Sequence, residues 1–441
     1  MRSVKMLLLG LPILVLAVSP AFATPKVYVV LSCDTEVDQT HSGWYQGNPP
    51  LRTYEHPTVF LDTYSRTSGP VKDVMASSFR NSHKDSYNNP FKITWFFEMD
   101  KFYHESRYVG GAPFTYTGTF SALENNWSSE RAQWHDEYAY HHHFMEWNGS
   151  DYWDQVTSSI NYDYHYDAIN YSLLEKGFMP ATYRGGWVWE DNYLSKNLLE
   201  QYIPFDYTND NNFSYWSGAP SSWVPYHPNR YNYKQTGNMD RLIVRCLSNP
   251  DDFTQANVNS ALAEAESING AVIFSYSFHN RDDMAGIIDD VHSKLQNASS
   301  NYGIPFEYTS STDAVQSVQG WTDRTAPGLT IYKQGSYFYL ESTESLWDDR
   351  AYIAYETTSG AYKRKGTTYL GSNTWRFYIP SYEGPVKIAA GASDAYGNTN
   401  VVWWTQGTGG IENIPEPASL SLILVSLTGI AAGAFRRLRA R

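Results

Sequence analysis

Two histidines separated by one residue, His141 and His143, carry the clearest chemical signal in this sequence. They lie in a run of tyrosines and histidines, residues 137–144, whose composition is typical of a β-strand. Residues two apart on a strand point to the same side, so the two imidazoles would lie close together on one face. Zinc prefers nitrogen ligands of this kind. The pair therefore predicts half of a metal site, although tyrosine- and histidine-rich surface strands without a metal also exist.

The elements that must position this pair are strands that alternate with helices. Short apolar runs typical of strands lie at 27–32, 93–98, 138–143, 181–183, 203–206, 242–247 and 272–278. Amphipathic stretches that predict helices lie at 158–176, 192–201, 254–268 and 282–296. This alternation predicts an α/β fold, a distorted (β/α)7-type barrel over residues 24–320. Inserts at 39–87 and 209–238 are expected to form loops over one face.

Ionisable side chains follow nearly every predicted strand. In a barrel of parallel strands, the active-site side chains come from the C-terminal ends of the strands. The residues at these ends are Asp34, Glu36, Glu98, Asp100, His141, His143, Arg184, Asp206 and His279. One or two such residues could follow strands by chance, whereas a complete series predicts a shared polar site.

Four of these segments resemble the motifs of the polysaccharide deacetylase family of metal-dependent carbohydrate esterases. The matching segments are 32–36 as the acidic motif, 140–143 as the histidine motif, 183–187 as the arginine motif and 277–279 as the last histidine motif. The resemblance covers roughly residues 27–320. It implies a distorted barrel in which an acid and two histidines hold one divalent ion, with zinc the first expectation.

Two departures from the family pattern concern the ligands. The family's usual acidic motif has adjacent aspartates, whereas here the acids are spaced as Asp34-x-Glu36. The usual histidine pair is spaced by four, and the residue four after His141 is Met145. Either His143 supplies the second imidazole ligand, or the metal is lost and only the fold remains.

The resemblance also implies a role for each site residue. Glu36, His141 and His143 are expected to hold the metal. Asp34 is expected to act as the base, and the roles of Asp34 and Glu36 are interchangeable. His279 would protonate the leaving group. Arg184 would orient Asp34, or form a structural salt bridge with it.

Three further residues are predicted to contact the substrate, a surface or matrix polysaccharide. Trp187 and Trp216 could stack on sugar rings, as could Trp189, although any one of these tryptophans could instead pack in the core. Asp206 is expected to orient a neighbouring group.

Two other functions are compatible with the same residues. A glycoside hydrolase on this barrel could draw its two carboxylates from Asp34, Glu36, Glu98 and Asp206. A surface protein without catalytic activity could use the aromatic loops to bind exopolysaccharide. Metal analysis and the separation of the carboxylates would distinguish these functions from deacetylation.

Both ends of the chain predict export. Residues 1–23 have the basic start, apolar run and small-residue cleavage site of a signal peptide. A linker at 406–414 precedes residues 415–441, an apolar stretch with a basic end that resembles a PEP-CTERM sorting signal. This resemblance implies a Gram-negative exporter, transient membrane anchoring, processing by an exosortase, and release to the cell surface or matrix. The alternative is a plain C-terminal membrane anchor.

Residues 322–405 have a different pattern, with short alternating strands separated by glycine-containing turns. They predict a small all-β sandwich that resembles bacterial Ig-like modules, acting as a spacer or a binding module. The two cysteines, Cys33 and Cys246, lie in apolar strand-like runs, which favours buried free thiols over a disulfide.

The net charge restricts the class of partner that the protein can bind. It is −13 for the whole chain, and becomes about −19 when the basic residues of the two end segments are left out. An acidic surface of this kind argues against nucleic acid, or another anionic polymer, as a partner held by charge alone. The aromatic content of 16% would instead suit stacking on sugars, in addition to filling the core.

Overall fold

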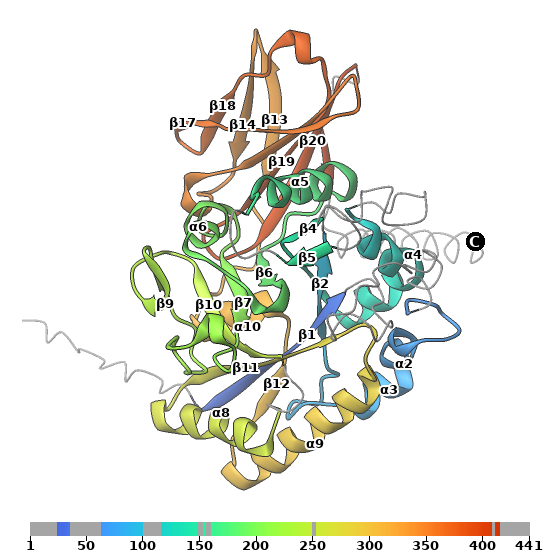
Figure 1. Ribbon diagram of the computed structural model, residues 1–441, viewed down its shortest axis with the longest axis vertical. Helices are drawn as coiled ribbons and strands as arrows, with labels where there is room; N and C mark the ends of the chain where they lie inside the picture. The colour runs from blue at the N-terminus through green and yellow to red at the C-terminus, as the bar shows by residue number, and fades with distance from the viewer. Residues whose placement is uncertain are drawn as a thin grey trace, which may run out of the picture.

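The computed structural model describes residues 24–35, 63–99, 116–147, 153–155, 160–248, 253–407 and 411–414. Within these residues, seven parallel strands close into a barrel in the order β1-β2-β3-β6-β7-β10-β11, and β11 pairs back to β1 (Figure 1). The strands are β1 (Lys26–Thr35), β2 (Ile93–Glu98), β3 (Glu137–His142), β6 (Thr182–Gly185), β7 (Phe205–Asn209), β10 (Leu242–Leu247) and β11 (Ala271–His279). A further short strand, β12 (Phe306–Tyr308), pairs with β1 beside the ring. The predicted barrel is confirmed.

The interior of the barrel is filled by alternate residues of the strands. The buried apolar side chains that pack together there are Val30, Phe96, Ala139, Phe205, Tyr207, Leu242, Val244, Cys246 and Ile273. Successive residues of a strand point to opposite faces, so the intervening residues, such as Leu31, Phe97 and Tyr140, pack outward in the larger core beneath the helices. The same alternation decides which polar residues near the strand ends face inward.

Helices surround the barrel. They are α2 (Pro70–Met75), α3 (Ser77–Ser82), α4 (Gly118–Trp134), α5 (Asp163–Tyr171) continued by the π-helix η4 (Ser172–Lys176), α6 (Asn192–Leu194) continued by η6 (Ser195–Leu199) and α7 (Glu200–Tyr202), α8 (Gln255–Ile268), α9 (Met284–Tyr302) and α10 (Ser311–Val318). The four helical stretches expected from the sequence are all present. Single turns of 3₁₀-helix lie at η5 (Gly186–Val188), η7 (Ser214–Trp216), η9 (Trp347–Asp349) and η10 (Ser381–Glu383).

Helix α10 closes the N-terminal end of the barrel. Ala314 and Val315 of this helix join the apolar side chains of the interior. At its start, Ser311 donates its backbone N–H to Thr94 Oγ1 of β2 at 3.0 Å, and the Tyr207 hydroxyl of β7 donates to the Ser311 carbonyl at 2.6 Å. The opposite end, where the strands finish, is not covered by this helix.

The C-terminal region forms a sandwich of two antiparallel sheets, as predicted. One sheet has the order β13-β14-β18-β17 and the other has the order β16-β15-β19-β20-β21. The strands are β13 (Leu329–Gln334), β14 (Tyr337–Ser342), β15 (Tyr352–Thr357), β16 (Tyr362–Lys365), β17 (Thr368–Gly371), β18 (Thr374–Phe377), β19 (Pro385–Ser393), β20 (Thr399–Thr405) and β21 (Ile411–Ile414). Side chains from both sheets, among them Phe338, Trp375 and Ile388, form one buried core.

The outer face of the five-stranded sheet packs against the barrel through α5 and η4, which lie between the two parts (Figure 1). The Trp403 indole donates to the Leu173 carbonyl at 2.8 Å, and Lys387 Nζ donates to the Leu174 carbonyl at 2.6 Å. A side chain on Gly391 would meet Leu173, because an added Cβ would lie 2.4 Å from Leu173 Cδ2. The sandwich is thus fixed to the barrel by close contacts.

Two hairpins lie outside the main sheets, β4 (Met145–Trp147) with β5 (Trp153–Gln155), and β8 (Pro228–Asn229) with β9 (Asn232–Thr236). Cys33 and Cys246 are buried free thiols, as expected. No helix in the described part of the chain is long and apolar enough to cross a membrane. The predicted signal peptide and the predicted sorting segment, residues 1–23 and 415–441, lie outside the described residues.

Candidate active site

The C-terminal ends of five neighbouring strands bring polar side chains together at the mouth of the barrel. In the register of the sheet, Asp34 of β1 pairs with His279 of β11, Glu98 of β2 pairs with His141 of β3, and His141 pairs with Arg184 of β6. Paired residues of adjacent parallel strands point to the same side of the sheet. Asp34, Glu98, His141 and Arg184 are nearly fully buried.

Arg184 binds Asp34 directly. Its Nε donates to Asp34 Oδ2 at 2.9 Å, and its Nη1 donates to the Tyr207 carbonyl at 2.7 Å. Burial alone would raise the pKa of Asp34, but Arg184, His141 and His279 together outweigh burial and lower it. Burial would likewise lower the pKa of Arg184, and Asp34 raises it. The carboxylate is therefore ionised at neutral pH and held in one orientation.

His141 and His143 converge through their Nε2 atoms, which lie 3.1 Å apart. His141 Nδ1 lies 2.9 Å from the Arg184 carbonyl, and because a carbonyl can only accept, Nδ1 carries the proton. The Nε2 lone pair of His141 therefore faces His143. Such a carbonyl partner is the usual means of orienting a histidine that binds a metal.

The spacing of these nitrogens fits a shared zinc-like ion. Zn–N bonds of about 2.0–2.1 Å at tetrahedral angles put two ligand nitrogens about 3.3 Å apart. The two Nε2 atoms are close to this separation in the structure. His142, between them, points to the other face, where its Nδ1 donates to the Met99 carbonyl at 2.8 Å. The sequence pair thus lies on one face as predicted.

The other predicted acidic ligand, Glu36, lies outside the described residues, as does Asp100. Within the described ranges, the group of three acidic or histidine side chains whose ligand atoms all lie within 4.8 Å of one another is Asp323, Glu344 and Asp394. Asp34 does not form such a group with the two histidines. Together with its bond to Arg184, this placement favours the role of base over that of ligand for Asp34.

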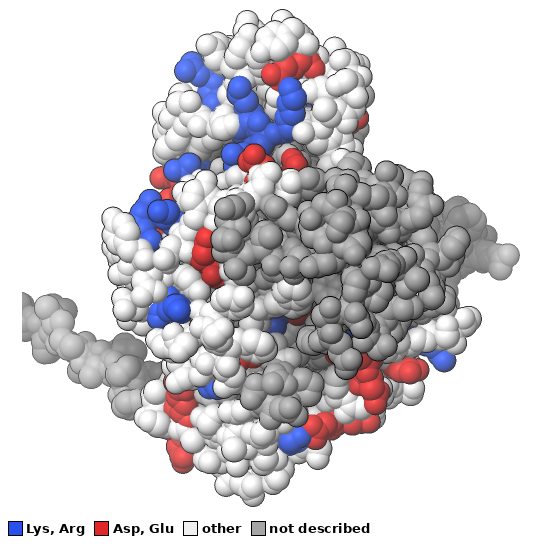
Figure 2. Space-filling view, viewed as in Figure 1, with Lys and Arg blue, Asp and Glu red and all other residues white. Residues whose placement is uncertain are grey.

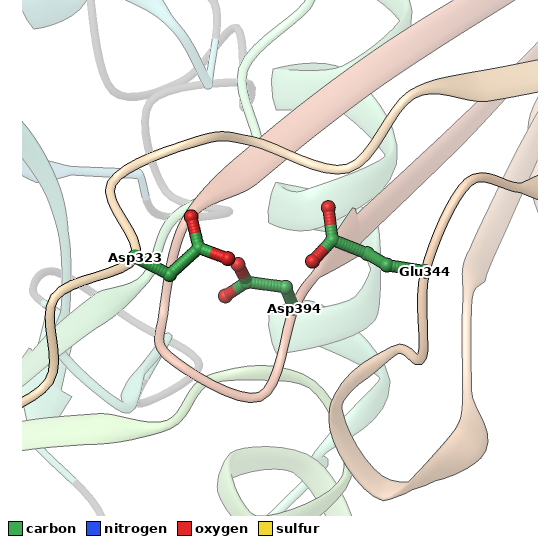
Figure 3. A group of neighbouring side chains, drawn as sticks. All are labelled: Asp323, Glu344 and Asp394. Carbon is green, nitrogen blue, oxygen red and sulfur yellow. The ribbon is translucent and has the colours of Figure 1, made fainter.

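Asp323, Glu344 and Asp394 form an acidic cluster in which the three carboxylates lie close together (Figure 3). Gln316 of α10 donates to the Tyr396 carbonyl at 2.8 Å in the loop that carries Asp394. Burial raises the pKa of Asp394 and of Glu344, and Asp323 raises both further. This cluster and the barrel mouth therefore lie at different ends of the barrel.

His279 of β11 lies next to Asp34 at the mouth of the barrel. Its backbone N–H donates to Asp282 Oδ2 at 2.7 Å, and its Nδ1 lies 3.1 Å from the same oxygen. Burial raises the pKa of Asp282, but His279 outweighs burial and lowers it. Because Nδ1 is engaged by Asp282, proton exchange with a substrate would have to use Nε2 of His279.

Trp187 stands at the mouth on a strained turn. Trp187 and Val188 both have positive φ angles, 49° and 51°, which β-branched valine in particular adopts rarely. The Trp187 side chain is 39% exposed, and its ring lies perpendicular to the His143 ring with centroids 5.6 Å apart. Gly186 permits this arrangement, because an added Cβ would lie 2.3 Å from His143 Cγ. Strain of this kind is a feature of functional sites.

Asp206 and Trp216 do not lie at the mouth of the barrel with the other predicted residues. Both side chains are fully buried. Asp206 Oδ2 accepts from Arg241 Nη1 at 3.2 Å, and Arg241 also binds Glu190. Asp206 precedes the inward-facing Tyr207 and so points outward from β7. Neither predicted side chain is accessible to a sugar, and no sequence pattern indicated Arg241 and Glu190 as the buried partners of Asp206.

Trp216 instead supports the strained turn. Its Nε1 donates to the Val188 carbonyl at 2.7 Å, and it packs with Val188 in a small buried cluster. Trp189, buried beside the turn, packs edge-on against Phe144 with ring centroids 4.5 Å apart. Of the four candidate aromatic and acidic contacts, only Trp187 is therefore open to a ligand in the described structure.

Comparisons with known proteins give little beyond this geometry. No protein-family model and no curated protein matches the chain. Solved structures that resemble it include a bacterial fucosidase with a bound inhibitor, at 9% identity and a TM-score of 0.31 over 88% of this chain and 94% of the other. A Cellulomonas fimi endo-beta-1,4-mannanase double mutant aligns at 12% identity and a TM-score of 0.25, over 75% and 89% of the two chains.

A carbohydrate acetylesterase from Xanthomonas citri aligns at 12% identity and a TM-score of 0.17, over 85% of this chain and 77% of the other. Identities and TM-scores this low carry no argument about function.

Proposed function

We propose that this protein is a metal-dependent carbohydrate deacetylase that removes acetyl groups from a polysaccharide. The observation that carries the proposal is the 3.1 Å separation of His141 Nε2 and His143 Nε2, with the tautomer of His141 fixed by the Arg184 carbonyl. A divalent ion, with zinc the first candidate, would be held by His141, His143 and Glu36. When bound, it would activate water and polarise the acetyl carbonyl.

Asp34 would take the proton of the attacking water. Its ionised state is maintained by Arg184, and Arg184 uses only Oδ2, so that Oδ1 is left for a proton. A carboxylate whose pKa is lowered is a weaker base, but it is present in the reactive form at neutral pH. Arg184 is thus a positioning residue for Asp34.

His279 would donate a proton to the departing sugar oxygen or nitrogen. It pairs with Asp34 across the β1–β11 register, so acid and base lie on neighbouring strands. Asp282 fixes the orientation of its ring. Trp187 would stack on a sugar ring beside His143, because its exposed indole is held at the mouth by the strained turn.

We also propose that the protein is exported to the cell surface or matrix, with transient anchoring of residues 415–441 in the membrane and processing by an exosortase. This part of the proposal rests on the sequence of the two end segments alone. Fractionation of the producing cells, with and without residues 415–441, tests it. Retention of the full chain in the cytoplasm would contradict export.

Metal analysis combined with an acetate-release assay on acetylated glycans tests the proposed reaction. Wild-type protein should bind about one divalent ion per chain and release acetate, and His141→Ala and His143→Ala should lose both properties. His135→Ala, at an exposed histidine that precedes the start of β3 and so lies at the opposite end of that strand from His141, serves as the control. Metal-free wild-type protein with full activity retained in both variants would refute the proposal. Release of reducing ends without acetate would identify a glycoside hydrolase instead.

A further inference from the structure

The outer face of the four-stranded sheet in the sandwich is lined with tyrosines. The register of the sheet places Tyr332 opposite Tyr339, and Tyr339 opposite Arg376. The Tyr332 and Tyr339 rings are stacked, with centroids 5.4 Å apart and planes 11° apart. Tyr337 and Tyr378 continue the row, with centroids 5.7 Å apart. We name these four tyrosines and Arg376 the tyrosine face.

The tyrosine face is open. Tyr337 and Tyr378 are each more than 40% exposed, and Tyr332, Tyr339 and Arg376 are half-buried. The other sheet of the sandwich packs on α5 and η4, so the tyrosine face points away from the barrel. The neighbouring residues on β13 and β14 that point inward, such as Ile331 and Phe338, are buried in the sandwich core. The exposure of the tyrosines is therefore not needed to build that core.

Arg376 gives this face a positive charge. Its guanidinium lies 4.7 Å from the centroid of the Tyr337 ring. None of the ion pairs within the described ranges includes Arg376, whereas the one acid on the same face, Glu341, accepts a hydrogen bond from the Tyr332 hydroxyl at 2.8 Å. A guanidinium without a carboxylate partner complements a carboxylate on a ligand.

The charge of the sandwich also differs from that of the remaining chain. Residues 322–405 contain eight basic and eight acidic residues, whereas the whole chain has a net charge of −13. Three of the eight acids form the cluster near α10. Figure 2 shows Lys and Arg side chains gathered over the sandwich, with Asp and Glu side chains mostly lower, over the barrel. A polyanion repelled by the barrel would therefore meet less repulsion here.

We infer that the tyrosine face binds an acidic polysaccharide, with sugar rings stacked on the tyrosines and a uronate carboxylate bound by Arg376. A sugar ring has an apolar face that suits the flat tyrosine rings, and its hydroxyls can bond the tyrosine hydroxyls at the edges. The planar guanidinium matches a carboxylate with two parallel hydrogen bonds. This site is separate from the barrel mouth and does not depend on the proposed deacetylation.

Affinity electrophoresis tests the inference, with the protein run through gels that contain polygalacturonate or its highly methyl-esterified form. The two polymers share a backbone and differ in charge. Wild-type protein should be retarded by polygalacturonate, and Arg376→Gln and Tyr337→Ala should each bind about tenfold more weakly. Tyr231→Ala, at an 80% exposed tyrosine on the barrel, is the matched control and should bind as the wild type does.

Turnover of a small acetylated substrate should be the same in all these variants, so that failure of the surface site and failure of the proposed reaction are distinguishable. Equal retardation of wild type and Arg376→Gln, or equal retardation by the charged and esterified polymers, would overturn the inference. Retardation by single-stranded DNA as strong as that by polygalacturonate would also overturn it, because it would show a nonspecific response to charge.

Discussion

The backbone carbonyl of Arg184 accepts a hydrogen bond from His141 Nδ1 at 2.9 Å, while its guanidinium binds Asp34. One residue therefore sets both the tautomer of a candidate metal ligand and the ionisation of a candidate base. This coupling joins strands far apart in sequence, of which β3 and β6 are adjacent in the barrel while β1 is separated from β6 by β2 and β3. It also determines which substitutions separate the two effects.

Arg184→Met should remove the guanidinium while the backbone carbonyl is kept. The variant leaves the Asp34 carboxylate buried without its partner, which should lower the free energy of unfolding by about 3–5 kcal/mol at pH 7. The folded-state pKa of Asp34 is lowered, so the stabilisation is present above its unfolded pKa, near 4, and is lost as the pH falls below that value. Urea unfolding at pH 7 and pH 3 measures this. If the difference in free energy of unfolding between wild type and variant is as large at pH 3 as at pH 7, the ion pair is not its cause.

Gly186→Ala should displace the His143 ring, because the added Cβ would lie 2.3 Å from His143 Cγ. Ring displacement should weaken metal binding by roughly tenfold or more, as loss of ligand orientation does in other sites. Gly366→Ala, where nothing lies within 4 Å of the added Cβ, is the control. Zinc titration by calorimetry provides the measurement, and equal affinity in both variants would speak against His143 as a ligand.

Trp216→Phe should loosen the turn that presents Trp187. The variant loses the bond from the indole to the Val188 carbonyl, which should lower the free energy of unfolding by about 1–3 kcal/mol. We expect KM for a glycan to rise while kcat changes little, because Trp187 binds sugar in ground state and transition state alike.

Trp127→Phe is the matched control for that experiment. Trp127 is also buried and donates its indole N–H to a backbone carbonyl, that of Tyr64, at 2.7 Å. The Trp127→Phe variant should lose a similar free energy of unfolding without the change in KM. If both variants show the same kinetics, Trp216 has only a structural role.

His292 should make the protein sensitive to acid. Burial, followed by the charge of nearby His83, lowers its pKa to about 4, although Asp289 opposes this change. Protonation therefore favours the unfolded chain, in which the pKa is near 6.5, and stability should fall as the pH drops from 6.5 to 4 by up to about 3 kcal/mol. His292→Gln should flatten this dependence in urea unfolding at several pH values. If the variant loses stability equally steeply as the pH falls, groups other than His292 cause the loss.

Much of the fold followed from the sequence. The alternation of apolar runs and amphipathic stretches predicted the barrel, and the runs at 93–98 and 242–247 became β2 and β10 without change. The prediction of these strands succeeded because a buried parallel strand must be apolar on both faces and so leaves a continuous apolar run in the sequence. The period of two on a strand likewise predicted that His141 and His143 would share a face.

The orientation of Asp206 and Trp216 was decided only by the tertiary structure. A shift of one residue along a strand moves a side chain to the opposite face, and the sequence of β7 does not reveal that Tyr207 points inward while Asp206 binds Arg241. Trp216 is of a residue type that often contacts sugars, but here it is buried and supports the turn at Val188, because the insert that carries it folds back onto that turn. The sequence by itself determined which chemical groups follow the strands. Packing across the barrel determined which of those groups meet, since the contacts join residues far apart in the sequence, 43 positions for His141 and Arg184 and 150 positions for Asp34 and Arg184.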